Sequence, residues 1–551
     1  MLRAAPPPAA TPGPPPDDPT GFEERLVFDT GRIAVAPPAA DRIAVDVHGE
    51  YQLRYRAHND LRLQPPQLDP SANTLGLNQY VYHWLRITPR LRYRDKIQIV
   101  GQIDIPRGMI FGDTTQYVDR VRDSLSEERW YEVQPRYLYL EYQAPFGLFR
   151  IGQQGSHWGM GLLANDGDHP TLFGDYQRGS LVDRVLFATT PMGRGTPLTI
   201  AIAGDLVFED NTADLIDGDD PDFDDDDDVG NRALQGVLAV LWRTKPAEIG
   251  IYGVLRKQDT ERESVPGSAS NASLTPFQDG LTVGVLDLSG KFNAPVGGAE
   301  AFVYGEFEWA FIFGSSNALR SAPGSVINAR AERESERVRT FGGAVTLGAV
   351  KVTGTGKERF GRVVGEVEWG YASGDADPYD GTTRRFTFDP NHNVGLVLFD
   401  HVMAWKTARS ATIAQDPRIV NRATPGLQLL PSKGGVFGAT YLNPRVIVRP
   451  WHWMDLKAGA VIAQTTADLV DPYQAGALGS YRNYDGGDPE RHDLGVELDA
   501  GVEGRIALDG VTTVQVGAEG GVLFTGHAFD DDAGNGLGKQ YAGQLELGLQ
   551  Y

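Results

Sequence analysis

A long and regular alternation of apolar and polar residues is the feature that most constrains what this chain can fold into. From Ile43 to Arg56, apolar residues, aromatic residues or glycine take every second position, and from Asp46 onward the positions between them are polar. A period of two predicts a β-strand with one apolar face. Strands of soluble proteins usually have about 5–6 residues, whereas a tilted strand that crosses a bilayer needs about 9–11. The length of this segment therefore favours a strand that spans a membrane.

The same alternation recurs along the chain and predicts about 18 strands. Short turns alternate with long polar segments between them, among them 156–180 and 373–435, and the latter contains a predicted helix near 398–414. Short turns on one side, long loops on the other and an even strand number are typical of bacterial outer-membrane barrels. The predicted strands are 43–56, 79–94, 96–106, 130–143, 147–155, 181–190, 198–208, 232–243, 248–258, 280–292, 299–313, 338–352, 360–372, 436–449, 455–464, 493–507, 511–523 and 541–551.

We therefore expect an all-β fold, a transmembrane antiparallel β-barrel with short periplasmic turns and long extracellular loops. Residues 43–551 form this barrel in the bacterial outer membrane, in contact with its lipid and lipopolysaccharide. Residues 1–42 are rich in Pro, which predicts an extended periplasmic tail. The tail either binds a periplasmic partner or is disordered without one.

The composition excludes several classes of function. The chain of 551 residues has 51 Lys and Arg against 73 Asp and Glu, a formal net charge of −22, which argues against binding to nucleic acid. There is no Cys, so disulfides, thiolate nucleophiles and Cys-metal sites are excluded. Motifs of metalloproteases, of serine hydrolases and of phosphate-binding loops are also missing. We expect no enzyme.

Charged residues on the polar faces of the strands are expected to line the lumen. The early strands carry mainly Arg and the middle and late strands mainly Glu and Asp, so that a basic wall and an acidic wall would set a transverse field across the pore. The alternative is that the opposite charges pair and only keep the lumen hydrated. The predicted basic residues are Arg54, Arg56, Arg86, Arg90, Arg92, Arg94, Arg136 and Arg150, and the predicted acidic ones are Glu306, Glu308, Glu366, Glu368, Glu497 and Asp499.

Two extracellular segments are rich in carboxylates, the ligands that Ca²⁺ prefers. The segment 209–231 has twelve carboxylates and no Lys or Arg, and we interpret it mainly as a solvated loop. Asp375, Asp377 and Asp380 lie in one turn and are the better calcium candidate, although the EF-hand spacing is missing. No other cofactor is expected.

Two segments resemble the alginate-export family of outer-membrane porins. Residues 149–154 with Trp158–Leu162 look like the end of a strand of that family with its glycine-rich loop, and 371–400 is similar to its long external loop. The resemblance implies an 18-stranded barrel, a lumen lined by Arg and Lys, and passage of an anionic polysaccharide. The chain departs from the family at Gln153, where Arg is usual, and in the inward Glu residues of its middle and late strands.

These features together predict a passive outer-membrane channel. A hydrophilic solute or an exported anionic glycan would diffuse through a polar lumen that inward-folded loops constrict, with 373–435 as the main constriction. The alternative is a barrel that its loops plug and that acts as a structural or docking element.

Overall fold

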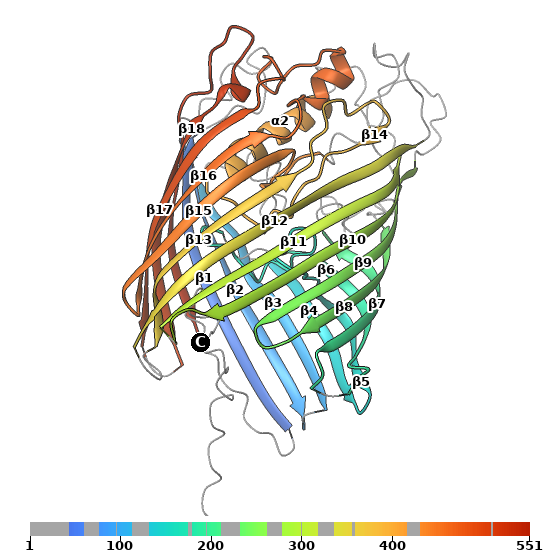
Figure 1. Cartoon of the computed structure of the whole chain (residues 1–551), viewed down its shortest axis with the longest axis vertical. Helices are drawn as coiled ribbons and strands as arrows, with labels where there is room; N and C mark the ends of the chain where they lie inside the picture. Colours follow the sequence, from blue (N-terminus) through green and yellow to red (C-terminus); the bar gives the residue numbers. More distant parts are fainter. Residues whose placement is uncertain are drawn as a thin grey trace, which may run out of the picture.

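The computed structural model describes residues 43–59, 77–94, 96–112, 132–174, 179–193, 195–210, 232–261, 278–298, 300–317, 335–354, 359–415, 430–508 and 511–551. The Pro-rich segment 1–42 and nearly all of the acidic segment 209–231 lie outside these residues. Strands dominate the described part of the chain (Figure 1). They are β1 (Ile43–Asn59), β2 (Leu77–Tyr93), β3 (Ile97–Gly112), β4 (Glu132–Ala144), β5 (Gly147–Gly155), β6 (Leu181–Thr189), β7 (Leu198–Glu209), β8 (Arg232–Arg243), β9 (Ala247–Glu261), β10 (Gln278–Pro295), β11 (Ala301–Ser316), β12 (Glu336–Thr353), β13 (Phe360–Ala372), β14 (Thr382–Thr383), β15 (Ala439–Trp451), β16 (Met454–Thr465), β17 (Asp493–Ala507), β18 (Thr513–Thr525) and β19 (Gln540–Gln550).

Eighteen of these strands form a closed antiparallel barrel. Each strand pairs with its neighbours in the sequence, and β1 pairs with β19 to close the ring. The remaining strand, β14, has two residues and pairs with β12 in parallel on the extracellular side. Every predicted strand is present, and the predicted fold class is confirmed. Several strands extend further toward the long loops than the alternation indicates, as β3 does up to Gly112.

The outer face of the barrel is apolar. Large apolar side chains that alternate with the lumen-facing residues are exposed on it, for example Ile202, Leu347 and Leu498. Aromatic side chains stand near both ends of the strands, as in the girdles of membrane barrels. Near the short turns these are Tyr93, Phe146, Trp242 and Trp451, and near the long loops they are Phe111, Phe313, Phe341 and Tyr541.

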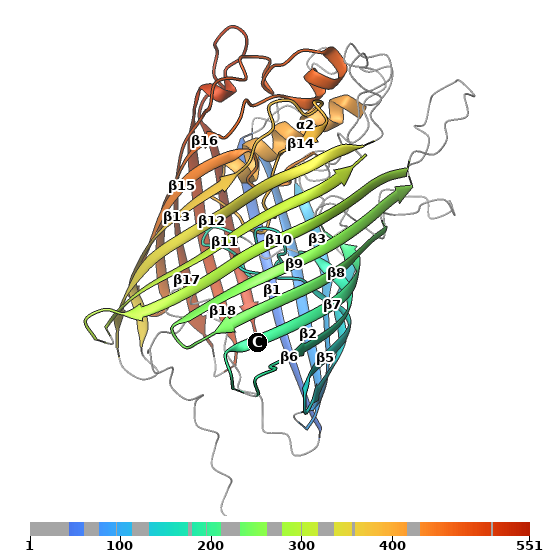
Figure 2. The ribbon, with the colours of Figure 1, turned by 45° about the vertical axis from the view of Figure 1, so that its right-hand side comes forward.

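Two of the long segments fold into the barrel. The loop between β5 and β6 runs across the lumen, and the segment between β13 and β15 fills part of its extracellular half (Figures 1 and 2). The second segment contains a short π-helix, η5 (Leu398–Met403), and then the helix α2 (Ala404–Gln415), which confirms the helix predicted near 398–414. No helix of the described part is both long and apolar enough to cross a membrane.

The inward segments and the wall share one apolar cluster. Aromatic residues of β2, such as Tyr82 and Trp84, are buried in it together with Phe173 of the first loop and Phe388 of the second. Smaller elements cover the extracellular end, namely η7 (Gln474–Leu478) and η8 (His527–Phe529).

Candidate functional site

The loop between β5 and β6, residues 156–180, narrows the lumen. Its two ends are joined by a hydrogen bond from the Ser156 N–H to the Ser180 carbonyl, at 3.0 Å. From there the loop reaches the distant wall, where the Trp158 indole N–H donates to Asp287 of β10 at 3.2 Å. Lys457 of β16 donates to the Leu172 carbonyl at 3.4 Å. The loop therefore contacts strands on several sides of the ring.

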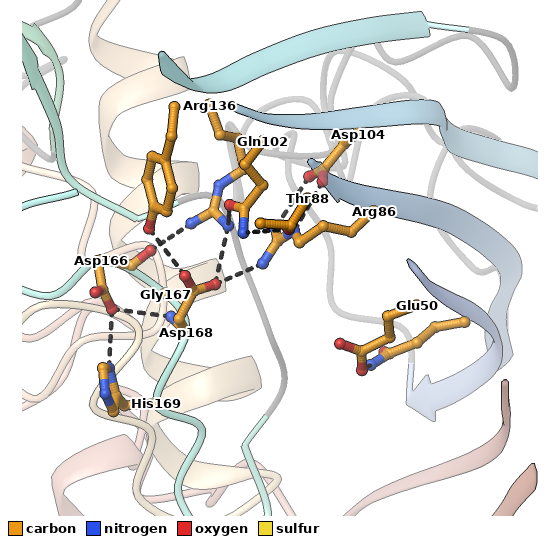
Figure 3. A network of polar contacts seen from close by, with 12 residues as sticks. Glu50, Arg86, Thr88, Gln102, Asp104, Arg136, Asp166, Gly167, Asp168 and His169 are labelled. Atoms are coloured by element: carbon orange, nitrogen blue, oxygen red, sulfur yellow. Dashed lines mark hydrogen bonds and ion pairs between the residues drawn. The ribbon is translucent and has the colours of Figure 1, made fainter. Parts of the chain in front are cut away.

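An aspartate of this loop joins two arginines of the wall (Figure 3). Asp168 accepts hydrogen bonds from Arg86 of β2 at 2.5 Å and from Arg136 of β4 at 2.9 Å. The Tyr137 hydroxyl donates to its other oxygen at 2.8 Å. Burial alone would raise the pKa of Asp168, but the guanidinium groups of Arg136 and Arg86 outweigh it and hold this pKa well below its usual range. Asp104 of β3 completes the network through two hydrogen bonds from Arg86, at 2.8 and 3.0 Å.

The other arginines of the predicted basic wall occupy two levels. Toward the long loops, Arg54 is buried and pairs with Glu546 of β19 at 3.2 Å, and Arg56 is buried with its guanidinium over the Tyr82 ring. Toward the short turns, where the lumen is more open, Arg90 and Arg94 are exposed. At this level Arg92 pairs with Asp46 at 3.0 Å, and Arg150 pairs with Glu141 at 2.6 Å.

The acidic residues of β11 and β13 lie on the opposite side of the ring from β2. Glu308 is buried and accepts the N–H groups of Met160 and Leu162, at 2.5 and 3.1 Å, so it holds the first inward loop. Glu306, on the same face of β11, is half-buried. Glu366 and Glu368 are buried and pair with Arg445 of β15, at 2.7 and 3.0 Å.

The acidic residues of β17 hold the second inward segment. Glu497 is buried and accepts three successive backbone N–H groups, from Leu396 at 2.5 Å, Val397 at 2.7 Å and Leu398 at 2.7 Å. Asp499 is buried beside it. Only β18 and β19 separate β17 from β1, so these two carboxylates are near the basic strands rather than opposite to them.

Two histidines anchor the same segment to the wall. His392 lies 3.2 Å from Glu368, and His401 contacts the Asn59 carbonyl of β1 at 2.9 Å. Burial of His392 would lower its pKa, but the neighbouring Glu368 outweighs this and the pKa is raised above its ordinary value. A charged His392 therefore strengthens the attachment of the segment to β13.

The three carboxylates proposed for calcium are engaged with their own turn and with the segment between β16 and β17. Asp375 accepts the Arg384 N–H at 2.9 Å, Asp377 accepts the Tyr481 hydroxyl at 2.9 Å, and Asp380 pairs with the Arg384 guanidinium at 2.8 Å. These contacts define the shape of the turn. Calcium binding here stays a prediction.

Several residues of the site have no clear signal in the sequence. Asp168 is one of three Asp in the long polar segment 156–180, and only the fold brings it to Arg86, which is 82 residues away. Arg445 is the exception, because it lies on the polar face of the predicted strand 436–449, as Arg54 lies on that of 43–56. The partner of Trp158, Asp287, is 129 residues distant.

The fold and the lumen together define a class of protein. A closed barrel with an even number of antiparallel strands, an apolar exterior, a polar interior and aromatic residues near both ends is the architecture of bacterial outer-membrane channels and related barrels. These features of the chain itself place it among the bacterial outer-membrane barrels.

Several solved structures have a similar course of the chain, and one of them is an outer membrane protein of Vibrio cholerae. They include OccK9 (OpdG) of Pseudomonas aeruginosa, which is 10% identical with a TM-score of 0.49, over 92% of this chain and 98% of that one. Another is OccAB1 of Acinetobacter baumannii, 8% identical with a TM-score of 0.48, over 94% of this chain and 99% of that one. No protein-family model and no curated protein matches the sequence. The resemblance to the alginate-export family therefore stays a prediction.

Proposed function

We propose that the chain is a passive outer-membrane channel that favours small hydrophilic anions. The observation that carries this proposal is the row of arginines on the lumen face of β2. Arg86 is at the level of the inward loop, and Arg90 and Arg92 continue the row toward the short turns. Arg keeps its charge at any working pH and binds carboxylate or phosphate through two parallel hydrogen bonds. A solute that passes the loop would meet the guanidinium groups of Arg90 and Arg92, whereas that of Arg86 is bound to Asp104 and Asp168.

The inward loops favour a small solute over an extended anionic glycan. Apolar residues of both loops pack against the wall in one cluster, so part of the lumen is filled rather than open. A polymer would need this cluster to separate, whereas a small solute needs only the polar surface beside it. Export of an anionic polysaccharide, which the family resemblance implies, is therefore the less favoured form of the channel proposal.

Ion selectivity in a planar bilayer tests the proposal. We expect the purified protein to conduct and to show a reversal potential that favours anions in a salt gradient. Neutralising two arginines of the row, Arg90→Gln with Arg92→Gln, should shift that potential toward cations. The shift should shrink at high salt because ions screen the wall charges.

The matched control changes the charge outside the lumen. Arg482→Gln removes a positive charge from an extracellular ion pair with Asp532, and it should leave the reversal potential unchanged. If the protein with Arg90→Gln and Arg92→Gln conducts and has the same reversal potential as the unaltered protein, the arginine row does not determine the ion selectivity.

The second candidate function is that of a plugged barrel with a structural or docking role. The specific observation in its favour is the burial of Leu162, Phe399 and Trp405, which the two inward segments place inside the ring of strands. A folded protein that inserts into bilayers without conducting would favour this candidate over the channel.

A further inference from the structure

The inward loop between β5 and β6 brings together two histidines and an aspartate. Nδ1 of His169 lies 3.0 Å from an Asp166 carboxylate oxygen, and Nδ1 of His157 lies 3.7 Å from the same oxygen. The two imidazole rings are stacked, with 4.1 Å between their centroids. One potential ligand atom from each residue lies within 4.8 Å of the other two. Figure 3 shows Asp166 and His169 directly beside the Asp168 network.

One ring nitrogen of His157 is available for a ligand. This Nδ1 atom is buried and has no hydrogen-bond partner among the described residues. A neutral imidazole with an available nitrogen is the form that binds metal ions.

We propose that His157, Asp166 and His169 form a binding site for a first-row transition-metal dication such as Zn²⁺. Two imidazole nitrogens and one carboxylate oxygen are a donor set that Zn²⁺ accepts, with bonds of about 2.0–2.2 Å. Because the three atoms are within 4.8 Å of one another, small side-chain movements bring them around one ion. The His169 side chain is 61% exposed, so water from the lumen can take the remaining position.

The surroundings of the site hold the ligands in place. The Asp168 N–H donates to the same Asp166 oxygen at 3.0 Å, and Arg136 donates to the Asp166 carbonyl at 2.5 Å. Contacts of this kind orient metal ligands and strengthen binding. A dication bound here would add positive charge at the narrow level of the lumen, beside Arg86 and Arg136.

The chain contains a natural control for the geometry. His527 and Asp530, in the extracellular element η8 and at its end, have the same i,i+3 spacing as Asp166 and His169 and the same 3.0 Å separation. No second histidine belongs to a metal-binding group with them in the described part of the chain. If a single histidine–aspartate pair were enough to bind Zn²⁺, the pair His527 and Asp530 would bind it as well as the pair His169 and Asp166 does.

Binding of Zn²⁺ to the full-length protein in detergent tests the proposal. Calorimetric titration at pH 7.5 should give one Zn²⁺ per chain. His169→Ala should weaken this binding by at least about tenfold, as should His157→Ala, because each removes a ligand. His527→Ala should bind as the unaltered protein does. Co²⁺ should give visible absorption bands that the same two variants lose.

Specific outcomes would overturn the site. They are the absence of stoichiometric binding, or equal affinity in His169→Ala and the unaltered protein. His169 is largely exposed, so His169→Ala should fold and can still test the site if His157→Ala does not fold. Folded samples are identified by the heat-dependent mobility of the barrel on a gel. The titration does not depend on conduction, so the metal site and the channel function are tested separately.

Discussion

At the scale of single residues, Asp168 attaches the first inward loop to the wall of the barrel. Its carboxylate is the point at which a loop that crosses the lumen meets arginines from β2 and β4. Breaking a buried ion pair by removing one partner is costly, because the remaining charge keeps its desolvation penalty without compensation. The Asp168 side chain therefore helps to hold the loop against β2 and β4, and it neutralises guanidinium charge in the lumen.

Asp168→Asn should loosen the loop and make the lumen more anion-selective. The substitution weakens three charge-assisted hydrogen bonds, each of which is typically worth about 1.5–3 kcal/mol. The reversal potential should move toward anions, and protease cleavage within 156–180 should become faster. Asp532→Asn, in an exposed extracellular loop, should change neither. An unchanged potential in Asp168→Asn would show that Arg86 and Arg136 do not influence permeation.

The pH dependence of this contact follows from the lowered pKa of Asp168. A carboxyl group whose pKa is lower in the folded protein contributes stability that is fully present above its unfolded pKa, about 3.9. That contribution is lost as the pH falls through the lower, folded pKa. The loop should therefore stay attached at pH 5 and loosen only in stronger acid.

Among the elements, β17 has a side chain that holds a segment about 100 residues before it. Glu497 accepts the N–H groups of Leu396, Val397 and Leu398, which directly precede η5 or begin it. These donors are buried and need an acceptor. The carboxylate thus substitutes for the missing hydrogen bonds at the start of η5 and α2.

Glu497→Ala should release this segment from the wall. Three buried N–H groups would lose their acceptor, at a cost of about 1–3 kcal/mol each. We expect faster amide exchange in 396–403 and larger fluctuations of conductance, while the barrel stays folded. Glu490→Ala, in an exposed extracellular loop, is the control. If the amides of 396–403 exchange as slowly in Glu497→Ala as in the unaltered protein, Glu497 does not hold this segment.

The difference between strands and loops explains how much of the structure the sequence predicts. A strand such as β1 is recognisable because its alternation is local and is imposed by lipid on one side and water on the other. The inward loops depend on pairs such as Trp158 with Asp287 and Thr171 with Asn393, which are 129 and 222 residues apart. No local pattern encodes such pairs. For the same reason the sequence indicates Arg86 as a lumen residue but not its partner Asp168.

At the scale of the whole molecule, the apolar exterior should make the two faces of a strand respond differently to charge. Ile202 is exposed on the outer face of β7, and Ala201 next to it faces the lumen. Arg on a lipid-facing midplane position costs about 2–4 kcal/mol. Ile202→Arg should therefore reduce the free energy of folding into lipid vesicles by about 2–4 kcal/mol. Ala201→Arg should reduce it by much less. Equal losses for both would mean that the outer face of β7 does not contact lipid.

The pairing of β1 with β19 has a consequence for the assembly of the barrel. The register joins Glu50 to Gln550, and the backbone of Tyr551 makes two hydrogen bonds with Gly49, at 2.9 and 3.0 Å. The tyrosine ring fills the space in which a side chain at Gly49 would lie. A ribosome makes β19 after all the other strands of the ring, so β1 waits for its second neighbour until the last of these strands has been made. During that time the sheet has two open edges that can join a wrong partner. The cell must therefore keep the nascent chain from aggregating until the ring can close.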